Sequence, residues 1–202
     1  EKELLGVQRT TADIPGWLIP TVYTDYLRSG DATEIVRVFY HNQLDMLSMV
    51  TLAGEIMRLF CHASADDDPT DLLSLGKWQA DLGLSTEAET HLRLAASGEL
   101  QLPHYHQALK NLGRLLKRGD RRHEAVPIWQ QWAATSLDDV EAHVELAMHF
   151  EWQERDLAKA KMWTEQALGL VSRWPRSSAA VARPPLEHRL KRLQRKLKAN
   201  QV

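Results

Sequence analysis

The stretch FYHNQLDMLSMVTLAGEIMRLF, residues 39–60, places four polar side chains at the start of an otherwise apolar segment. These are Tyr40, His41, Asn42 and Asp45, and a histidine four positions before an aspartate shares its face of a helix. Histidine exchanges a proton near neutral pH, and carboxylates bind hard divalent cations. The spacing therefore permits a corner of an active site. It equally permits a helix start, in which Asn42 caps the helix that follows and Asp45 favours the positive end of its dipole.

Three helices are expected in the first sixty residues. Pro20 is tolerated in the first turn of a helix over residues 17–27. Asp31, with Glu34 three positions later, predicts the start of a second helix. A third helix would run from about residue 45 to residue 60 and would carry the polar group at its start.

An internal repeat follows this first part. Gly76 and Gly113 are 37 residues apart, Ala88 and Ala125 are also 37 apart, and Ala160 lies 35 further on. Apolar residues recur every three or four positions in paired segments, as they do in amphipathic helices. A small residue at the start of each second helix lets the two helices of a pair approach closely. The periodicity therefore predicts an α-solenoid.

The repeat resembles the tetratricopeptide repeat over about residues 70–175. That family places a small residue early in the first helix and an alanine twelve positions later, and both glycine–alanine pairs have this spacing. In the third unit Ala147 and Ala160 are thirteen apart, which indicates an extra residue in the turn EWQERD, residues 151–156. In the first repeat, Thr86 and Glu89 predict a capping box at a helix start.

The N-terminal part is similar to the C-terminal part of DEDD-type 3′-to-5′ exonucleases of ribonuclease H-like fold. The resemblance is to a branch whose members often carry tetratricopeptide repeats behind the nuclease, and it extends over about fifty residues. The matching positions are Gly6, Arg9, Asp13, Pro15, Gly16, Pro20, Tyr23, Tyr26, Leu27, Gly30, Asp31, Tyr40, His41, Asn42, Asp45 and Ser48.

The resemblance implies specific roles for the polar group. Enzymes of this type hold two divalent metal ions, Mg²⁺ or Mn²⁺, with four acidic side chains and hydrolyse the terminal phosphodiester with an activated water. Asp45 matches the last acidic residue, a metal ligand, and His41 or Tyr40 matches the residue that orients or deprotonates the water. In this family histidine usually stands five positions before the aspartate and tyrosine four, whereas here histidine stands at four and tyrosine at five. We favour His41, because His-Asn followed by aspartate is typical of this branch.

The remaining metal ligands of that family do not occur in this sequence. Its first two carboxylates lie on a strand as Asp-x-Glu, and a further aspartate follows, both upstream of the matched part. The one Asp-x-Glu here, Asp139 to Glu141, begins a repeat helix and predicts a cap with a first-turn acid. One ligand cannot hold two metals, so the cofactor requires upstream carboxylates and the chain alone is expected to be inert. It begins at Glu1 rather than at methionine, as a piece cut from a longer protein would.

The charge is unevenly distributed. The formal net charge is −2, yet residues 61–172 carry eleven Lys/Arg against eighteen Asp/Glu, and residues 173–202 carry nine against one. In the final segment Leu186, Leu190 and Leu193 form an apolar stripe, joined by Leu197, opposite a basic face. This helix could cap the open end of the solenoid or bind phosphates of nucleic acid. We favour the capping role.

Other residues give weaker signals. Cys61 is the single cysteine, which excludes an intramolecular disulfide, fits a reducing compartment and predicts a small buried side chain. The sequence lacks both an apolar run of membrane-spanning length and the order of a signal peptide. We therefore expect a cytoplasmic protein with no membrane contact. His104 and His106 are two apart and would diverge on a helix, which argues against a metal pair.

These observations predict an all-α chain: C-terminal helices of a ribonuclease H-like domain in residues 1–62, a linker in 63–70, tetratricopeptide-like repeats in 71–175, and a linker with a basic helix in 176–202. The expected function is that of the C-terminal portion of a metal-dependent 3′-to-5′ exonuclease acting on nucleic-acid ends. The alternative is a non-enzymatic protein-interaction module formed by the repeats. Whether the chain is an enzyme, and whether the substrate is DNA or RNA, stays open.

Overall fold

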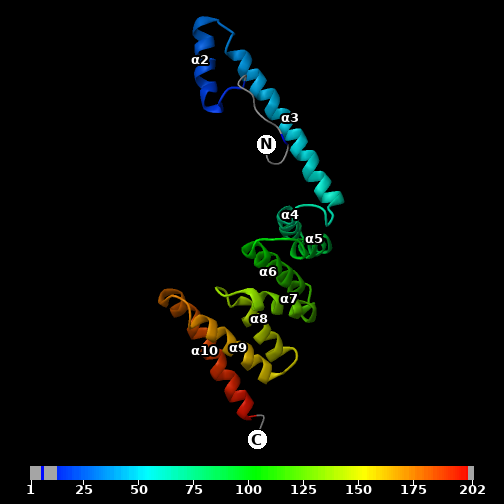
Figure 1. Ribbon diagram of the computed structural model, residues 1–202, viewed down its shortest axis with the longest axis vertical. Helices are drawn as coiled ribbons and strands as arrows, with labels where there is room; N and C mark the ends of the chain where they lie inside the picture. Colours follow the sequence, from blue (N-terminus) through cyan, green and yellow to red (C-terminus); the bar gives the residue numbers. More distant parts are fainter. Residues whose placement is uncertain (1–5, 7–12, 200–202) are drawn as a thin grey trace. The chain divides into compact units, whose positions relative to one another are not determined.

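The computed structural model describes residue 6 and residues 13–199 of the chain (Figure 1). In this described part every regular element is a helix, which confirms the all-α prediction. The chain divides into two compact units, Glu1–Ala63 and Ser64–Val202, and each is described by itself.

The first unit contains a 3₁₀ turn and two α-helices. The turn η1 spans Gly16–Leu18, α2 spans Ile19–Ser29 and α3 spans Ile35–His62. Pro20 lies in the first turn of α2, as predicted, where its missing N–H costs no hydrogen bond. The chain leaves α2 through Gly30, whose φ of 73° is readily adopted only by glycine.

The predicted break near Asn42 is wrong, because α3 runs without interruption through this residue. The helix begins after Glu34, and Asn42 is an exposed residue inside it rather than its cap. Asp31 accepts a 3.0 Å hydrogen bond from the N–H of Thr33, so it stabilises the turn that precedes the helix. Asparagine costs a helix interior only a few tenths of a kcal/mol relative to good helix formers, so a single one does not end a long helix.

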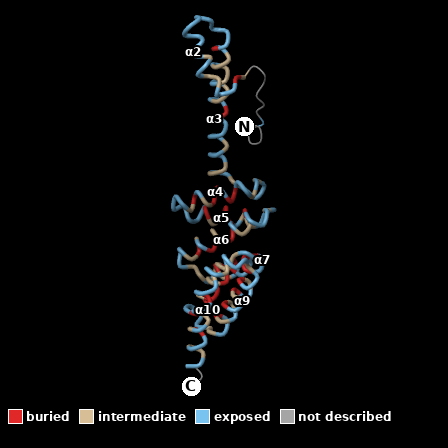
Figure 2. Tube along the Cα trace, turned by 90° about the vertical axis from the view of Figure 1, so that its left-hand side faces the viewer, coloured by how far each residue is buried: buried red, intermediate tan, exposed pale blue. Residues whose placement is uncertain are grey.

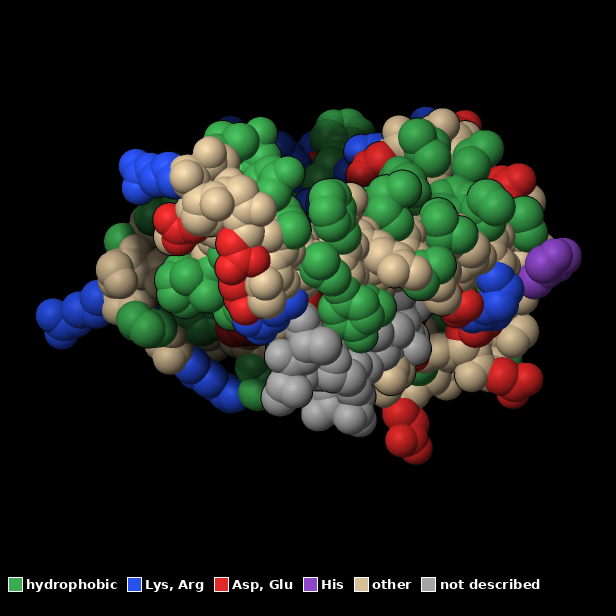
Figure 3. Space-filling model, turned by 90° about the horizontal axis from the view of Figure 1, so that it is seen from above, with side chains coloured by type: hydrophobic (Ala, Val, Ile, Leu, Met, Phe, Trp, Pro, Cys, Tyr) green, Lys and Arg blue, Asp and Glu red, His purple; other side chains and the backbone are tan. Residues whose placement is uncertain are grey.

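Large hydrophobic side chains of α3 are exposed on more than one face. Val36, Phe39 and Val50 are 60%, 67% and 71% exposed, and Met49 and Met57 are 59% and 65% exposed. Most of α3 is correspondingly exposed or intermediate in Figure 2, and hydrophobic side chains are prominent on the surface in Figure 3. A helix that is apolar on several faces is typical of a protein interior.

The second unit begins with three helix pairs. The first pair is α4, Pro69–Asp81, with α5, Ser85–Ser97; the second is α6, Leu102–Arg118, with α7, Arg122–Thr135; the third is α8, Glu141–Trp152, with α9, Leu157–Val171. Asp68 caps α4 by accepting a 2.7 Å hydrogen bond from the N–H of Thr70, so the connection before the pairs is two residues shorter than predicted.

The repeated small residues lie where the helices of a pair touch. A Cβ placed on Gly76 would come within 2.8 Å of the Leu92 side chain, and one on Gly113 within 2.4 Å of Trp129 Nε1. Ala88, near the start of the second helix of the first pair, is completely buried. The equivalent alanines of the other two pairs, Ala125 and Ala160, are also completely buried. The sequence spacing therefore identified positions of close contact between the paired helices.

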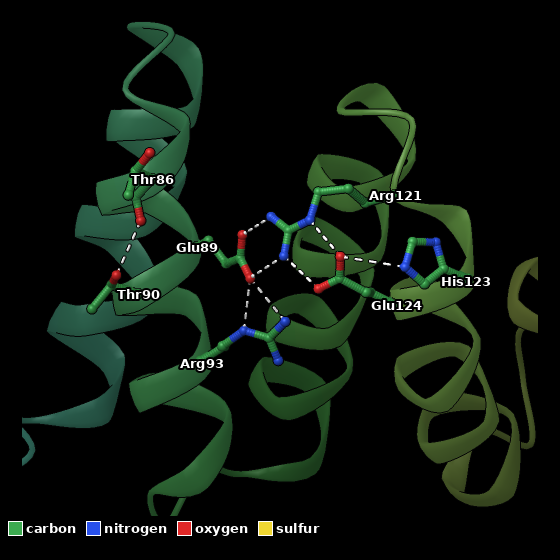
Figure 4. Close-up of polar contacts among 7 residues, drawn as sticks. All are labelled: Thr86, Glu89, Thr90, Arg93, Arg121, His123 and Glu124. Carbon is green, nitrogen blue, oxygen red and sulfur yellow. Dashed lines mark hydrogen bonds and ion pairs between the residues drawn. The ribbon is translucent and has the colours of Figure 1, made fainter.

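An ion-pair network links the first two pairs (Figure 4). Arg121, at the turn before α7, donates to Glu89 of α5 at 2.6 Å and to Glu124 at 2.7 Å. Arg93 also donates to Glu89, at 2.9 Å. The predicted capping box is wrong, because Thr86 lies inside α5 and Glu89 binds these arginines instead of the helix start. Hydrogen bonds from Arg121 hold the pKa of Glu89 below its ordinary value.

The unit ends with a single helix, α10, Arg176–Ala199. The linker predicted at its start is wrong, because this segment is helical and Pro184 and Pro185 lie inside the helix. Each proline in a helix interior costs about 3 kcal/mol, more than the alanines before them return, so the packing of α10 against α9 stabilises the helix here. Leu186 and Leu193 are buried, and Leu186 packs with Ala167 and Val171 of α9. The helix thus covers the apolar end of the last pair, as a capping element must.

Candidate functional site

Helix α3 places His41 and Asp45 on one face, one turn apart. His41 Nε2 lies 3.2 Å from Asp45 Oδ2. The His41 side chain is 15% exposed and that of Asp45 is 40% exposed. Both lie in the interior of α3, where every backbone group can be hydrogen-bonded within the helix, so their relative position is fixed by regular helix geometry.

A third polar residue, Asp13, reaches this pair from the segment before η1. Its Oδ1 lies 2.8 Å from His41 Nδ1, and its side chain is only 9% exposed. Asp13 Oδ1 also accepts a 2.8 Å hydrogen bond from the N–H of Ile14, which is buried. One turn before His41, Arg37 donates to the backbone carbonyl of Asp13 at 3.0 Å. Two side chains of α3 thereby hold this segment in place.

The contact with Asp13 determines what His41 can do. An ionised carboxylate only accepts hydrogen bonds, so Nδ1 of His41 must donate to Asp13. In the neutral imidazole this leaves Nε2 without a proton, as a base beside Asp45. When both ring nitrogens carry protons, the ring is a cation between two carboxylates. A buried carboxylate that fixes the tautomer and orientation of a histidine is a common arrangement around reactive imidazoles.

Other predicted site residues do not join this group. Tyr40 is half-buried and adjacent to His41 in sequence, so its side chain points about 100° away around the helix, and its hydroxyl makes no hydrogen bond within the described part of the chain. Asn42 is exposed. Arg9, one of the positions of the nuclease resemblance, lies outside the described residues.

Asp13 is the residue that local spacing could not identify as a partner of His41. It matched the nuclease resemblance, but the two residues are 28 positions apart and no helical period relates them. The turn sequence Asp-Ile-Pro-Gly, residues 13–16, was the available signal, since aspartate before such a turn often binds neighbouring backbone N–H groups.

The described residues do not form a metal site by themselves. Among residue 6 and residues 13–199, no group of three or more His, Cys, Asp or Glu side chains is arranged to hold a metal ion. Asp13 and Asp45 both face the same imidazole instead of converging on one point. Asp45 could supply at most part of a ligand set that other carboxylates complete.

Other candidates from the sequence have structural roles. Asp139 accepts a 2.7 Å hydrogen bond from the N–H of Glu141 but lies one position before the N-cap Val140, so it stabilises the turn that leads into α8, and Glu141 is the predicted first-turn acid. His106 Nε2 contacts the hydroxyl of Thr135 at 3.0 Å. The prediction that Cys61 is buried is wrong, because its thiol is exposed near the end of α3. In the described part of the chain, no helix combines the length and apolar character needed to cross a membrane.

Comparisons with known proteins give a family match to the first unit and a longer match that extends into the second. Residues 1–57 match the family model described as the RNase_H superfamily. The chain is also 27% identical over 171 residues to the uncharacterized protein YprB of Bacillus subtilis strain 168, an alignment that covers 83% of this chain and 41% of the relative. The chain thus spans less than half the length of this relative. No solved structure gives a significant match. These matches support a ribonuclease H-like domain in the N-terminal part.

Proposed function

We propose that this chain is the C-terminal portion of a metal-dependent 3′-to-5′ exonuclease of the DEDD type, with a tetratricopeptide-like repeat unit behind the nuclease. The observation that carries the proposal is the orientation of His41 by Asp13, which presents Nε2 beside Asp45. The match of residues 1–57 to the RNase_H superfamily supports nucleic acid as the substrate and divalent metal ions as the cofactor.

In this proposal the three side chains have separate tasks. Asp45, 40% exposed, would supply one oxygen ligand to a divalent metal ion, and carboxylates other than those of the Asp13–His41–Asp45 group would supply the rest. His41 accepts or orients a proton of the attacking water through Nε2. Asp13 is a positioning residue, because it contacts the imidazole and not the substrate. Tyr40 is the weaker candidate for the water-handling role, since no side chain in the described part of the chain forms a hydrogen bond that would fix its ring.

The exposed apolar surface of α3 after Asp45 supports the presence of another structural element that packs against this helix. Met49, Leu52 and Ile56 follow Asp45 at spacings of three and four, so they continue its face of the helix. They are 59%, 39% and 36% exposed. Apolar strips of this kind mark surfaces that pack against another element. We propose that the sheet of the ribonuclease H-like domain covers this strip and brings its carboxylates to Asp45.

The test uses the full-length gene product that contains this chain. With Mg²⁺ or Mn²⁺ it should shorten a 5′-labelled single-stranded oligonucleotide from the 3′ end. Asp45→Asn should abolish this activity, His41→Gln should lower it by about 10²–10⁴-fold, and Asp13→Asn by about 10–100-fold. Asp25→Asn, the same change at an exposed position of α2, is the matched control and should be without effect. Full activity of Asp45→Asn would exclude the proposed ligand.

A further inference from the structure

The carboxylate of Glu151 in α8 is fully buried and is bound by three cations of α10. Arg192 donates to it from Nη2 at 2.7 Å, Lys196 from Nζ at 2.9 Å, and Arg189 from Nη1 at 3.3 Å. The side chain of Glu151 has no exposed area. One carboxylate balances only one of three positive charges, so this end of α10 keeps a positive excess.

The neighbouring residue, Trp152, presents an indole ring beside these cations. The Lys196 ammonium lies 4.2 Å from the ring centroid and the Arg192 guanidinium 5.9 Å from it. Trp152 is nevertheless 58% exposed, although large aromatic side chains are usually buried. A cation against one face of the ring leaves the other face available for a flat ligand, and the cation strengthens such stacking.

An open pocket of about 410 Å³ adjoins the indole. Trp152 and Leu157 supply its apolar wall, and Arg155 and Lys196 supply positive charge. Its volume falls within the range of about 300–1,000 Å³ that is usual for small-molecule sites. The pocket therefore combines an aromatic surface, an aliphatic wall and two cations.

A second row of cations runs along α10 next to this pocket. Lys191, Arg195 and Lys198 are three or four residues apart and share one face of the helix. All three are exposed and form no ion pair with any residue that the structure describes. Arg195 stands one helical turn before Ala199, which lines the pocket, so this row adjoins the pocket along the face of α10 that Arg195 and Ala199 share.

We propose that Trp152 and the basic row of α10 bind single-stranded nucleic acid, with a base stacked on the indole and backbone phosphates on Lys191, Arg195 and Lys198. Exposed aromatic rings beside a cationic track are typical of proteins that bind single strands without sequence preference. A duplex keeps its base faces stacked inside and could use only the charges. An acidic peptide would likewise make no use of the indole face. This site lies in the second unit, shares no residue with the Asp13–His41–Asp45 group, and does not depend on the proposed nuclease activity.

The test measures binding of the full chain to a 5′-fluorescein-labelled oligothymidylate by fluorescence anisotropy, in EDTA so that no metal-dependent step contributes. Trp152→Ala should weaken binding by about five- to a hundredfold, the range for loss of one stacked base. Trp152→Phe, which retains an aromatic face, should recover part of the affinity. Equal melting temperatures of the three proteins would show that the differences are not caused by unfolding.

A matched pair of double variants tests the basic row. Arg195→Gln with Lys198→Gln should weaken binding and reduce the slope of log affinity against log salt by about 1.4, which corresponds to two lost phosphate contacts on a single strand. Arg176→Gln with Arg183→Gln removes the same charge from exposed positions at the other end of α10 and should leave both quantities nearly unchanged.

Three results would overturn the proposal. The first is an affinity of Trp152→Ala within twofold of the parent chain. The second is an equal loss in the two double variants, which would indicate general attraction to positive charge. The third is displacement of the labelled oligothymidylate by an oligoglutamate peptide at the same concentration at which unlabelled oligothymidylate displaces it. That result would indicate an acidic peptide as the ligand. Binding is measured in EDTA with the Trp152 and Arg195/Lys198 variants, whereas the nuclease proposal is tested by metal-dependent cleavage with Asp45→Asn, so failure of one proposal is distinguishable from failure of the other.

Discussion

Gly113 of α6 lies directly against the indole of Trp129 of α7, and a Cβ at this position would come within 2.4 Å of Nε1. Trp129 is 2% exposed, so neither the ring nor the helix can move aside without disturbing the core of the second unit. The glycine is therefore required by the packing of the middle helix pair and not by its backbone conformation.

Replacement of this glycine should destabilise the second unit. Gly113→Ala should lower the free energy of unfolding by about 1–3 kcal/mol, because overpacking exceeds the gain in helix propensity. The matched control is Gly169→Ala in α9, where a Cβ would meet no atom within 4 Å. That change should be neutral or should stabilise by up to about 1 kcal/mol. Urea unfolding followed by circular dichroism measures both, and equal stability of the two variants would contradict the packing role.

Removal of the buried charge of Glu151 should be more costly. Glu151→Gln leaves three cations of α10 without their shared carboxylate and should destabilise the second unit by about 3–5 kcal/mol. Glu165→Gln removes an exposed partner of Lys161 and should cost less than about 1 kcal/mol. The comparison is made by urea unfolding at neutral pH. A loss below 1 kcal/mol for Glu151→Gln would show that α10 is held by its leucines alone.

Acid should destabilise the second unit in two steps. Burial lowers the pKa of His143, and the pKa of His91 is lowered for the same reason. The unfolded chain therefore takes up protons first as pH falls below about 6.5, so stability decreases until the pKa of each folded histidine is passed. Burial raises the pKa of Glu151, but hydrogen bonds from Arg192 and Lys196 outweigh it and hold that pKa below its ordinary value. The stability that the ionised Glu151 carboxylate contributes is therefore lost only as the pH falls below about 4.5.

The first step can be assigned by substitution. His143→Gln should make stability less dependent on pH between about 7 and 5, since the buried Nδ1 that lacks a described hydrogen-bond partner is replaced by a group that does not titrate. His104→Gln, at an exposed position of α6, should leave the pH dependence unchanged. The measurement is the unfolding free energy across this range. An unchanged slope in His143→Gln would remove His143 as the cause.

The thiol of Cys61 should react in the folded protein. Because it is exposed, Ellman's reagent should modify one thiol per chain without denaturant, at a rate close to that of the unfolded chain. Without reductant the chain should slowly form disulfide-linked dimers, and Cys61→Ser should prevent them. Non-reducing electrophoresis measures the dimer. A thiol that reacts only after unfolding would contradict the exposed position.

Much of the second unit could be predicted from its sequence, because its helices follow from local spacing. The glycines and alanines of the repeat lie at close contacts, and Leu186 of α10 packs against α9. Arg121 could not be assigned in this way. It belongs to the polar turn GDRRH, residues 119–123, yet it donates a hydrogen bond to Glu89, which lies 32 residues earlier in the sequence. Contacts between neighbouring pairs depend on how the pairs stack, which no single helix encodes.

The candidate site was predicted only in part for the same reason. The pairing of His41 with Asp45 follows from helical spacing, whereas Asp13 joins through a tertiary contact. The predicted cap at Asn42 failed because a polar residue that could start a helix is also tolerated within one. Residues 35–53 contain neither glycine nor proline, the residues that most often end a helix.

The continuity of α3 through Asn42 also determines how much of the helix must unfold before the His41 and Asp45 side chains separate. Helix ends open and close readily, while interior turns open only when several successive hydrogen bonds break together. His41 lies six residues after the start of this 28-residue helix and Asp45 lies ten residues after it. The amide protons at these positions should therefore exchange with solvent far more slowly than those of the first turn. Their geometry should persist until most of the N-terminal half of α3 has unravelled.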